Sequence, residues 1–397
     1  MRIALIGCGA TGSVAAAHLA KVAEVEALVL ADAVPGRADR LAAGLGRKAA
    51  VGRIEGGDLG RAIRGADLAI NAAHASLDLA LMDACLDEGA HYMDLSSVPS
   101  KQFPYDARFR KAGLTALLGG GEDPGLGNVL ARYGADRLDA VDSIRIRDGD
   151  IVSTDATPLP VVWSPETFLA EVFTDALYFE DGKIVTVPPW SGREMYRFPD
   201  PVGPRPVYLM EHEEPETLPR FIGKGVRYVD LKLCVEDRVR ELLLTLHGLG
   251  LLSNDPIDGV PPRKLLLSLL PRPTDLVGKV DGHAMIVVEV MGTTDGAQVT
   301  HRLWSGMTHA EAARRHRATA TAYMVGTGAA IFATQIARGQ VRQAGVIAAE
   351  SLEPKETVRL MATYGLPVTH EVVTRTSLDG DRAGARRTIS GTGPRRR

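Results

Sequence analysis

The stretch Gly7-Cys8-Gly9-Ala10-Thr11-Gly12 follows the short apolar run Arg2-Ile3-Ala4-Leu5-Ile6 and precedes an Ala-rich segment from Ser13 to Val22. A G-x-G-x-x-G pattern between a strand and a helix is typical of a dinucleotide-binding loop. In such a loop Gly7 permits the tight turn, Gly9 lets a pyrophosphate approach the backbone, and Gly12 allows close packing of the helix on the strand. Unpaired N–H groups at Ala10 and Thr11, where the helix begins, favour bound phosphate. We therefore expect a nucleotide-binding βα unit here.

An acidic residue stands where the adenosine ribose of such a cofactor would bind. Asp32 lies 20 residues past Gly12, at the end of the apolar run of residues 28–31. A carboxylate there accepts hydrogen bonds from a ribose diol and repels a 2′-phosphate. The expected cofactor is NAD, and NADP stays open because Arg37 or Arg40 could meet a 2′-phosphate.

Further cofactor contacts are expected where other strands end, because open parallel sheets bind ligands at the carboxyl ends of their strands. Asp58 and Leu59 are candidates for the adenine, with a plain loop acid as the alternative. Asn71, Ala72 and His74 follow the apolar run of residues 68–72, and the small residues leave room for a nicotinamide ribose. His74 lies either near the redox centre or in a loop with only a local hydrogen bond.

The pattern of expected strands and helices changes near residue 125. Before it, continuous apolar strands alternate with helices, which predicts a parallel sheet covered on both faces. After it, helices are sparser, prolines cluster, and a mixed-sheet α+β domain is expected. The expected strands are 140–155, 183–188, 205–211, 226–235, 284–291 and 297–304.

Local signals mark several helices. Ser76 is expected to cap a helix that ends at Gly89, Ser164-Pro165 starts another, and Thr308 with Glu311 forms a capping box. Residues 318–337 contain no charged side chain, but their threonines and glycines favour a core helix pair bent at residues 326–328 over a membrane span.

Composition excludes some classes of partner. The 397 residues carry 46 basic and 49 acidic side chains, a net charge of −3, which argues against broad binding to nucleic acid or anionic membranes. Three cysteines without metal-site spacing and an N-terminus without a signal-peptide pattern indicate a reducing, cytoplasmic location and no metal site. The segment 373–397 has little apolar content after its first residues and is expected to be disordered.

The sequence also resembles the saccharopine dehydrogenase-like family. The resemblance rests on Gly7–Gly12, Tyr92-Met93-Asp94-Leu95-Ser96, Gly121-Glu122-Asp123-Pro124-Gly125-Leu126-Gly127-Asn128, Glu211-His212-Glu213-Glu214-Pro215, Thr217-Leu218-Pro219 and Gly345-Val346. It covers the chain to about residue 372, and the shorter L-lysine 6-dehydrogenase-like members look most similar.

The resemblance implies an α/β fold in which a Rossmann-like, doubly wound parallel sheet is interrupted by an inserted α+β mixed-sheet domain. The dinucleotide-binding domain would span 1–128 and the substrate and dimerisation domain 129–307. Helices of 308–372 would return to the first domain. The resemblance further implies a homodimer and a small amine or amino-acid substrate.

Chemistry on a C–N bond needs a group that moves a proton and a carboxylate near the developing iminium. Asp123 is the first candidate, because Pro124 restricts its backbone at the domain junction; an Asp-Pro-Gly turn is the alternative. Asp94 is the second, with an Asx turn as its alternative. Lys101 is a possible acid–base or a solvated lysine.

His212 and Glu213 could meet the polar head of the substrate or could anchor a loop, and Arg227 or Arg220 could bind a substrate carboxylate. The expected function is NAD(P)-dependent oxidoreduction of a CH–NH or CH–NH2 bond, as in L-lysine 6-dehydrogenase. The alternatives are an opine-, saccharopine- or carboxynorspermidine-type imine reductase, an enoyl or ketone reductase, and a dinucleotide-binding sensor without turnover.

Overall fold

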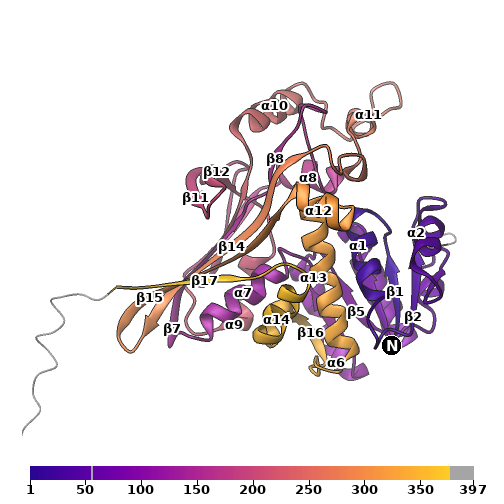
Figure 1. The fold of residues 1–397 in the computed structure, drawn as a ribbon, viewed down its shortest axis with the longest axis horizontal. Helices are drawn as coiled ribbons and strands as arrows, with labels where there is room; N and C mark the ends of the chain where they lie inside the picture. Colours follow the sequence, from indigo (N-terminus) through magenta and orange to yellow (C-terminus); the bar gives the residue numbers. More distant parts are fainter. Residues whose placement is uncertain (55–56, 376–397) are drawn as a thin grey trace, which may run out of the picture.

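The computed structural model describes residues 1–54 and 57–375 and contains two separate β-sheets (Figure 1). The first is a seven-stranded sheet in the order β16-β6-β5-β4-β1-β2-β3, with every pair parallel. Its strands are β1 (Arg2–Ile6), β2 (Ala27–Ala31), β3 (Ala49–Val51), β4 (Leu68–Asn71), β5 (His91–Asp94), β6 (Thr115–Leu118) and β16 (Gly345–Ala348). The order reverses between β1 and β4, which makes the sheet doubly wound.

Helices follow the strands of this sheet because each apolar strand needs cover on both faces. They are α1 (Ala10–Leu19), α2 (Arg37–Leu45), α3 (Leu59–Ile63), α4 (Asp78–Glu88), α5 (Pro99–Gln102) and α6 (Asp106–Ala112). Short 3-10 turns η1 (Ala75–Leu77) and η2 (Phe103–Tyr105) precede α4 and α6.

The second sheet is mixed and has ten strands, with a main path β10-β9-β13-β7-β14-β15-β17. Strands β7 and β13 run parallel and their other neighbours antiparallel. The strands are β7 (Ala140–Asp148), β8 (Ile151–Ser153), β9 (Ala176–Glu180), β10 (Lys183–Val187), β11 (Glu194–Phe198), β12 (Gly203–Leu209), β13 (Tyr228–Cys234), β14 (Asp281–Thr294), β15 (Ala297–Thr308) and β17 (Thr369–Arg375).

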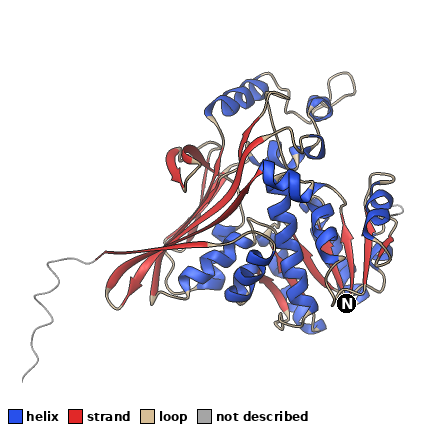
Figure 2. Cartoon of the chain, viewed as in Figure 1, coloured by secondary structure: helices blue, strands red, loops and turns tan. Residues whose placement is uncertain are grey.

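A layer of helices lies between the two sheets (Figure 2). It contains α7 (Leu126–Ala135), α12 (His309–His316), α13 (Ala320–Ala337) and α14 (Pro354–Thr363), with η4 (Ala349–Ser351) between β16 and α14. Helix α13 packs on α1, and α7 packs on β14 and β15. Helix α9 (Glu214–Ile222) packs on α7 and η4 as well as on β9 and β13. The elements around the end of the mixed sheet are α8 (Pro165–Glu171), α10 (Asp237–Gly248), α11 (Pro262–Leu269) and η3 (Pro273–Asp275).

The expected local signals are confirmed at several helix ends. Ser164 Oγ accepts a hydrogen bond from the Thr167 N–H, and Thr308 Oγ1 accepts one from the Glu311 N–H. Gly89 ends α4 in the left-handed conformation. The cap before α4 is displaced: Ser76 lies inside η1, and His74 caps that turn.

The expected bend at residues 326–328 is wrong, because α13 is one continuous helix of 18 residues. Its glycines serve close packing instead. A methyl group at Gly326 would lie 2.6 Å from the Thr11 carbonyl oxygen, and one at Gly328 would lie 2.1 Å from the Gly121 carbonyl oxygen. No helix in the described residues is long and apolar enough to span a membrane.

The end of the chain differs from expectation in two ways. The segment that returns to the parallel sheet supplies a strand, β16, as well as helices, and β17 then rejoins the mixed sheet beside β15. Residues 373–375, expected to start a disordered tail, belong to β17. The remainder of that expectation, residues 376–397, lies outside the described residues.

Candidate active site

The glycine-rich loop has the geometry that a bound pyrophosphate requires. Gly7 has φ of +101°, and a methyl group there would lie 2.6 Å from the Ala72 carbonyl oxygen. A methyl group at Gly12 would lie 2.0 Å from the Gly7 carbonyl oxygen, whereas one at Gly9 would meet no atom within 4 Å. Gly9 is thus the open position above the start of α1, and the loop fits a dinucleotide as the sequence predicts.

Asp32 is tied to this loop. Its Oδ2 accepts a hydrogen bond from the Cys8 N–H at 2.7 Å, and its Oδ1 accepts one from the Val34 N–H at 2.7 Å. Arg37 approaches the same carboxylate at 3.4 Å. Asp32 therefore sets the shape of the loop and keeps a negative charge at the end of β2, while Arg37 offsets part of that charge.

The other expected cofactor residues lie at strand ends but are mostly engaged in local hydrogen bonds. Asp58 caps α3 through the Arg61 N–H, and Leu59 is buried in that helix. Asn71 Oδ1 accepts from the Ala73 N–H at 3.0 Å, which shapes the loop containing Ala72. His74 Nδ1 lies 3.0 Å from Ser76 Oγ at an exposed position.

Asp94, the second catalytic candidate, is fully buried at the end of β5. Its Oδ1 accepts from the Gly119 N–H at 2.6 Å, and its Oδ2 accepts from Gln102 Nε2 at 2.7 Å. The Tyr92 hydroxyl lies 2.9 Å from the same Oδ2. Both oxygens are thus engaged with the protein, and the structure does not bring Asp94 to an accessible part of the site.

Asp123 lies on the tight turn between β6 and α7. The Gly121 N–H donates to the Pro124 carbonyl oxygen, and the Gly125 N–H donates to Asn128 Oδ1 at 2.8 Å. Asn128 Nδ2 in turn donates to Glu350 Oε2 at 3.1 Å. The motif asparagine therefore holds the turn and ties it to the segment after β16.

Asp148, at the end of β7, lies beside Asp123, close enough for the two carboxyls to share a proton, and Asp123 Oδ2 is buried without another hydrogen-bond partner in the described residues. The packing of α7 explains why the two meet. A methyl group at Gly127 would lie 3.3 Å from Ile286, and Ile286 is the register partner of Asp148. Burial and the mutual repulsion of neighbouring carboxylates raise the pKa of both aspartates well above the usual range. One proton between the two is the expected state at neutral pH.

More carboxyls surround this pair, and burial raises the pKa of each. The pKa of Asp150 is raised to about 6 and that of Glu171 to about 7, while the pKa of Glu122 is raised well above its usual value. Glu122 Oε1 has no hydrogen-bond partner in the described residues although it is buried. A buried oxygen without a donor is costly unless a cation or donor meets it.

His212, Glu213 and Glu214 complete the cluster from the start of α9. His212 Nδ1 lies 2.5 Å from Glu214 Oε2 and 3.2 Å from Glu213 Oε2. The nearby carboxylates hold the pKa of His212 well above its usual value against the effect of burial. Glu213 Oε1 also accepts from the Ser97 N–H at 2.5 Å, so this segment joins the loop after β5.

These three side chains offer ligand atoms within 4.8 Å of one another, an arrangement that can hold a cation. No cysteine or histidine spacing in the sequence indicates this arrangement, and no metal site was expected. In the structure the adjacent imidazolium of His212 already neutralises part of the charge of the two glutamates.

Asp148, Asp150 and Glu171 were missed by the sequence analysis. The available signal was the pair of acidic residues Asp148 and Asp150 inside the expected strand of residues 140–155, which the structure divides into β7 and β8. Pattern alone could not show that this strand end faces the turn of Asp123, because the two belong to different sheets.

The basic residues expected to contact the substrate lie away from the carboxyl cluster. Arg227 precedes β13 and pairs with Asp181 at 2.9 Å on the surface, whereas Asp148 lies beside Leu233 at the other end of that strand. Arg220 stacks over Phe103 at 4.1 Å. Lys101 is exposed on α5. The structure therefore does not bring Arg227 to the carboxyl cluster.

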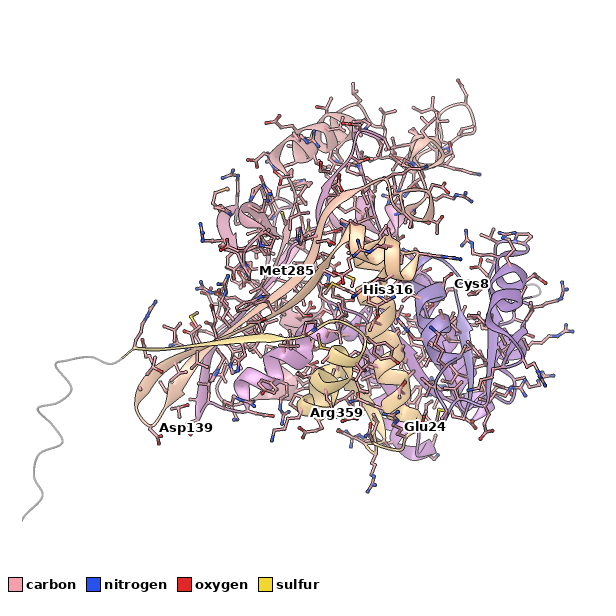
Figure 3. All side chains as sticks on the ribbon, viewed as in Figure 1. Cys8, Glu24, Asp139, Met285, His316 and Arg359 are labelled. Carbon is pink, nitrogen blue, oxygen red and sulfur yellow. The ribbon has the colours of Figure 1, made fainter. Side chains whose placement is uncertain are left out.

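A basic cavity of about 230 Å³ lies on the α1 side of α13. It is lined by His18 of α1, by Lys21 just after that helix, and by His316 at the end of α12, which Figure 3 labels. The carboxyl cluster lies on the opposite face of α13, where Thr321 Oγ1 donates to Asp150. The cavity is therefore separate from the cluster.

Comparison with known proteins identifies the family. A family model described as the saccharopine dehydrogenase NADP binding domain matches residues 3–117, and one described as the saccharopine dehydrogenase C-terminal domain matches residues 121–365.

Two curated relatives and one solved structure agree with this match. A carboxyaminopropylagmatine dehydrogenase of Synechocystis sp. is 29% identical over 395 residues, covering 94% of this chain and 98% of the relative. A carboxynorspermidine synthase of Vibrio alginolyticus is 31% identical over 322 residues, 76% of each chain. Apo saccharopine dehydrogenase (L-Glu forming) from Saccharomyces cerevisiae has the same fold, with a TM-score of 0.67 at 16% identity over 94% of this chain and 99% of that chain. With its glycine-rich loop and its buried carboxyl cluster, the chain belongs to the saccharopine dehydrogenase family and is an NAD(P)-dependent oxidoreductase of C–N bonds.

Proposed function

We propose that the enzyme joins a cationic amine to an amino-acid-like carbonyl compound by reducing the imine that forms between them. Condensation of the amine with the carbonyl releases water, and the imine then takes up a hydride and a proton to become a secondary amine. The nicotinamide cofactor supplies the hydride when it is bound. The opposite direction, oxidation of the secondary amine, uses the same groups.

The carboxyl cluster is the observation that carries this proposal. Asp123, Asp148, Glu213 and Glu214 gather around a single imidazolium, that of His212. So many carboxyls in a buried place are stable only if protons or cations compensate them. A substrate with ammonium or guanidinium groups meets that requirement, and the names of the two curated relatives contain agmatine and norspermidine.

The pair of Asp123 and Asp148 is proposed to move the proton. Because the two buried carboxyls are neighbours with raised pKa values, one holds a proton that it can give to the nitrogen as the hydride arrives. The ionised partner can stabilise the positive charge of the iminium that precedes this step. His212 and Glu213 are proposed to bind the distal cationic part of the amine together, and the protonation of the two side chains is proposed to change when the cation binds.

The preferred cofactor is proposed to be NAD. Asp32 keeps its carboxylate at the end of β2, bonded to the Cys8 and Val34 N–H groups, where a 2′-phosphate would be repelled. Arg37 lies 3.4 Å from that carboxylate and weakens the repulsion, so the expected discrimination against NADP is moderate.

The test is consumption of NADH with paired substrates. Agmatine or a linear diamine is combined with an amino acid that carries an aldehyde, and each compound is also tested alone. The proposal expects NADH loss only when both are present, with a product of the combined mass. If no pair supports NADH loss, the proposed reaction is wrong.

Oxidation of a single amine, as by L-lysine 6-dehydrogenase, is the second candidate. It is favoured by the same Asp123–Asp148 pair, which can accept the proton of an ammonium as well as donate one. NADH formation from L-lysine and NAD, without any carbonyl compound, would select this candidate.

A cytoplasmic homodimer is proposed with either reaction. The three cysteines are free and buried, as suits a reducing compartment. The exposed Val372 and Val373 lie on β17 at the open edge of the mixed sheet, where a second copy could pair. Light scattering of the purified protein measures the oligomeric state.

A further inference from the structure

A second group of acids lies apart from the carboxyl cluster, inside the parallel sheet. Asp78 begins α4, and Tyr92 and Asp94 lie on β5. All three side chains are buried, with at most 1% exposure. The proposed proton transfer does not use them, and such burial of two carboxyls needs an explanation.

Hydrogen bonds join the three into one network. The Tyr92 hydroxyl lies 2.8 Å from Asp78 Oδ1 and 2.9 Å from Asp94 Oδ2. Asn71 Nδ2 donates to Asp78 Oδ1 at 2.7 Å, and Gln102 Nε2 donates to Asp94 Oδ2 at 2.7 Å. The Gln102 amide is oriented by its own oxygen, which accepts from the Val98 N–H.

Counting hydrogens shows that the network holds a carboxyl proton. Two oxygen–oxygen contacts meet at the Tyr92 hydroxyl, and each needs a hydrogen, but the hydroxyl has only one. The second must come from Asp78 or Asp94. Two ionised carboxylates around one phenol would leave one contact repulsive in a place that water does not reach.

The network also determines where three strand-end loops lie. Asp94 Oδ1 accepts from the Gly119 N–H, and its carbonyl oxygen accepts from the Gly120 N–H at 2.7 Å, so it holds the segment that leads to Asp123. Asn71 links Asp78 to the loop after β4 through the Ala73 N–H. These loops follow β4, β5 and β6, whose carboxyl ends form the edge where a dinucleotide binds in a doubly wound sheet.

We propose that Asp78, Tyr92 and Asp94 share one carboxyl proton at neutral pH and act as positioning residues for the nicotinamide end of the cofactor site. Asp94 is then not a catalytic group, as the sequence suggested, but the residue that fixes the Gly119–Gly121 loop. The inference concerns the cofactor-binding half and does not depend on which amine the enzyme uses.

The ionisation behaviour of the two acids agrees with the geometry. Burial raises the pKa of Asp78 to about 7, against the opposing effect of hydrogen bonds from Asn71 and Tyr92. Burial and the charge of Asp78 raise the pKa of Asp94 well above its usual value. Among the hydrogen-bond and ion-pair partners of this pair in residues 1–54 and 57–375 there is no lysine, arginine or histidine.

The first test compares wild type with the Asp78→Asn variant by thermal unfolding of the apo protein from pH 5 to pH 8. In the variant, the amide NH2 group turned toward Tyr92 supplies the second hydrogen without titrating, at the cost of the hydrogen bond from Asn71. The control is Asp87→Asn, the same chemical change at an exposed position of the same helix.

The expected sign follows from proton binding. An unfolded aspartate releases its proton near pH 4, whereas native Asp78 keeps it to about pH 7. Between these values the folded wild type binds more protons than the unfolded chain, so its stability falls as pH rises. Asp78→Asn lacks this loss. As pH rises, the folding equilibrium constant of the variant is therefore expected to increase relative to that of wild type by up to about tenfold per pH unit.

The second test measures NADH affinity by fluorescence titration. In Asp94→Asn, the new amide NH2 faces a donor in either orientation, either the Gly119 N–H or Gln102 Nε2, so one bond is lost and the loop moves. We expect NADH affinity to fall about tenfold in this variant, a loss of about 1.4 kcal/mol. Asp78→Asn should lose less than threefold.

Two results would overturn the proposal. One is a pH profile of Asp78→Asn that runs parallel to those of wild type and Asp87→Asn, since a network without a shared proton predicts no difference in slope. The other is unchanged NADH affinity in folded Asp94→Asn. If Asp94→Asn does not fold, the Asp78→Asn profile still decides on the shared proton.

Discussion

Replacement of Gly328 by alanine should separate the packing role of this glycine from the usual benefit of alanine in a helix. The new methyl group would lie 2.1 Å from the Gly121 carbonyl oxygen and 2.7 Å from its carbon. Both atoms are backbone, so neither can turn away. Either α13 or the turn that carries Asp123 must shift.

The expected magnitude follows from two opposing effects. Alanine in a helix interior gains about 1 kcal/mol over glycine. Overpacking a tight core costs about 1–3 kcal/mol and more where no side chain can yield. At 2.1 Å from a backbone oxygen the upper end applies. We therefore expect Gly328→Ala to lower the free energy of unfolding by about 2 kcal/mol in total.

Equilibrium unfolding in urea measures this change, and Gly44→Ala is the matched control. Gly44 lies in α2, and a methyl group there would meet no atom within 4 Å. The control should raise stability by about 0.5–1 kcal/mol. If Gly328→Ala is as stable as wild type or gains like the control, the close contact between α13 and the Gly121 turn does not exist as described.

Further substitutions test the site. Asp123→Asn should lower kcat by about 10²–10⁴-fold with a smaller effect on KM, measured from NADH turnover, and an unchanged kcat would remove Asp123 from proton transfer. Adding Asp148→Asn to Asp123→Asn should cost far less than Asp148→Asn alone, because the two share one proton; independent losses that multiply would contradict the pair. Asp32→Ser should raise kcat/KM for NADP relative to NAD by at least about tenfold, since it removes the charge that repels a 2′-phosphate. A wild-type enzyme with a higher kcat/KM for NADP than for NAD would contradict this role of Asp32. Arg227→Gln should leave kcat/KM within about twofold, because Arg227 pairs with Asp181 at the far end of β13, and a large rise in KM would restore it as a substrate residue.

The dinucleotide-binding loop could be predicted because its signal is local. Gly7 and Gly12 allow close contacts with neighbours near in sequence or at the end of the adjacent strand, whereas Gly9 leaves open space. The position of Asp32 was equally readable from its distance to Gly12. The sequence could not show that an Asp32 carboxylate oxygen also accepts a hydrogen bond from the Cys8 N–H.

Glycines in α13 show where a local rule misleads. Gly326 and Gly328 weaken a helix by their own propensity, so a bend was the natural expectation. In the structure the helix is continuous, and each glycine lets a backbone oxygen from a distant segment approach it, Thr11 in one case and Gly121 in the other. Such contacts depend on tertiary packing that no pattern within residues 318–337 reveals.

Asp94 shows that a residue can be placed correctly and its role still be mistaken. Its position at the end of β5 followed from the sequence, and parallel strands do carry functional groups there. However, the residues around it decide whether a strand-end carboxylate faces a ligand or the protein. Tyr92, Gln102 and Gly119 all point to it.

Asp148 is the strongest case of a site residue that only the tertiary structure could supply. It lies in the first strand of the mixed sheet, whereas Asp123 ends the parallel-sheet segment, so neither sheet builds the acid pair alone. Helix α7 starts at Leu126, close to Asp123, and Gly127 in its first turn packs against Ile286 of β14. Since Ile286 pairs in register with Asp148, the absence of a side chain at Gly127 lets the start of α7 lie close to the strands that carry Asp148. The inserted domain therefore does more than cover the cofactor-binding half. It supplies Asp148, the second acid of the proposed pair.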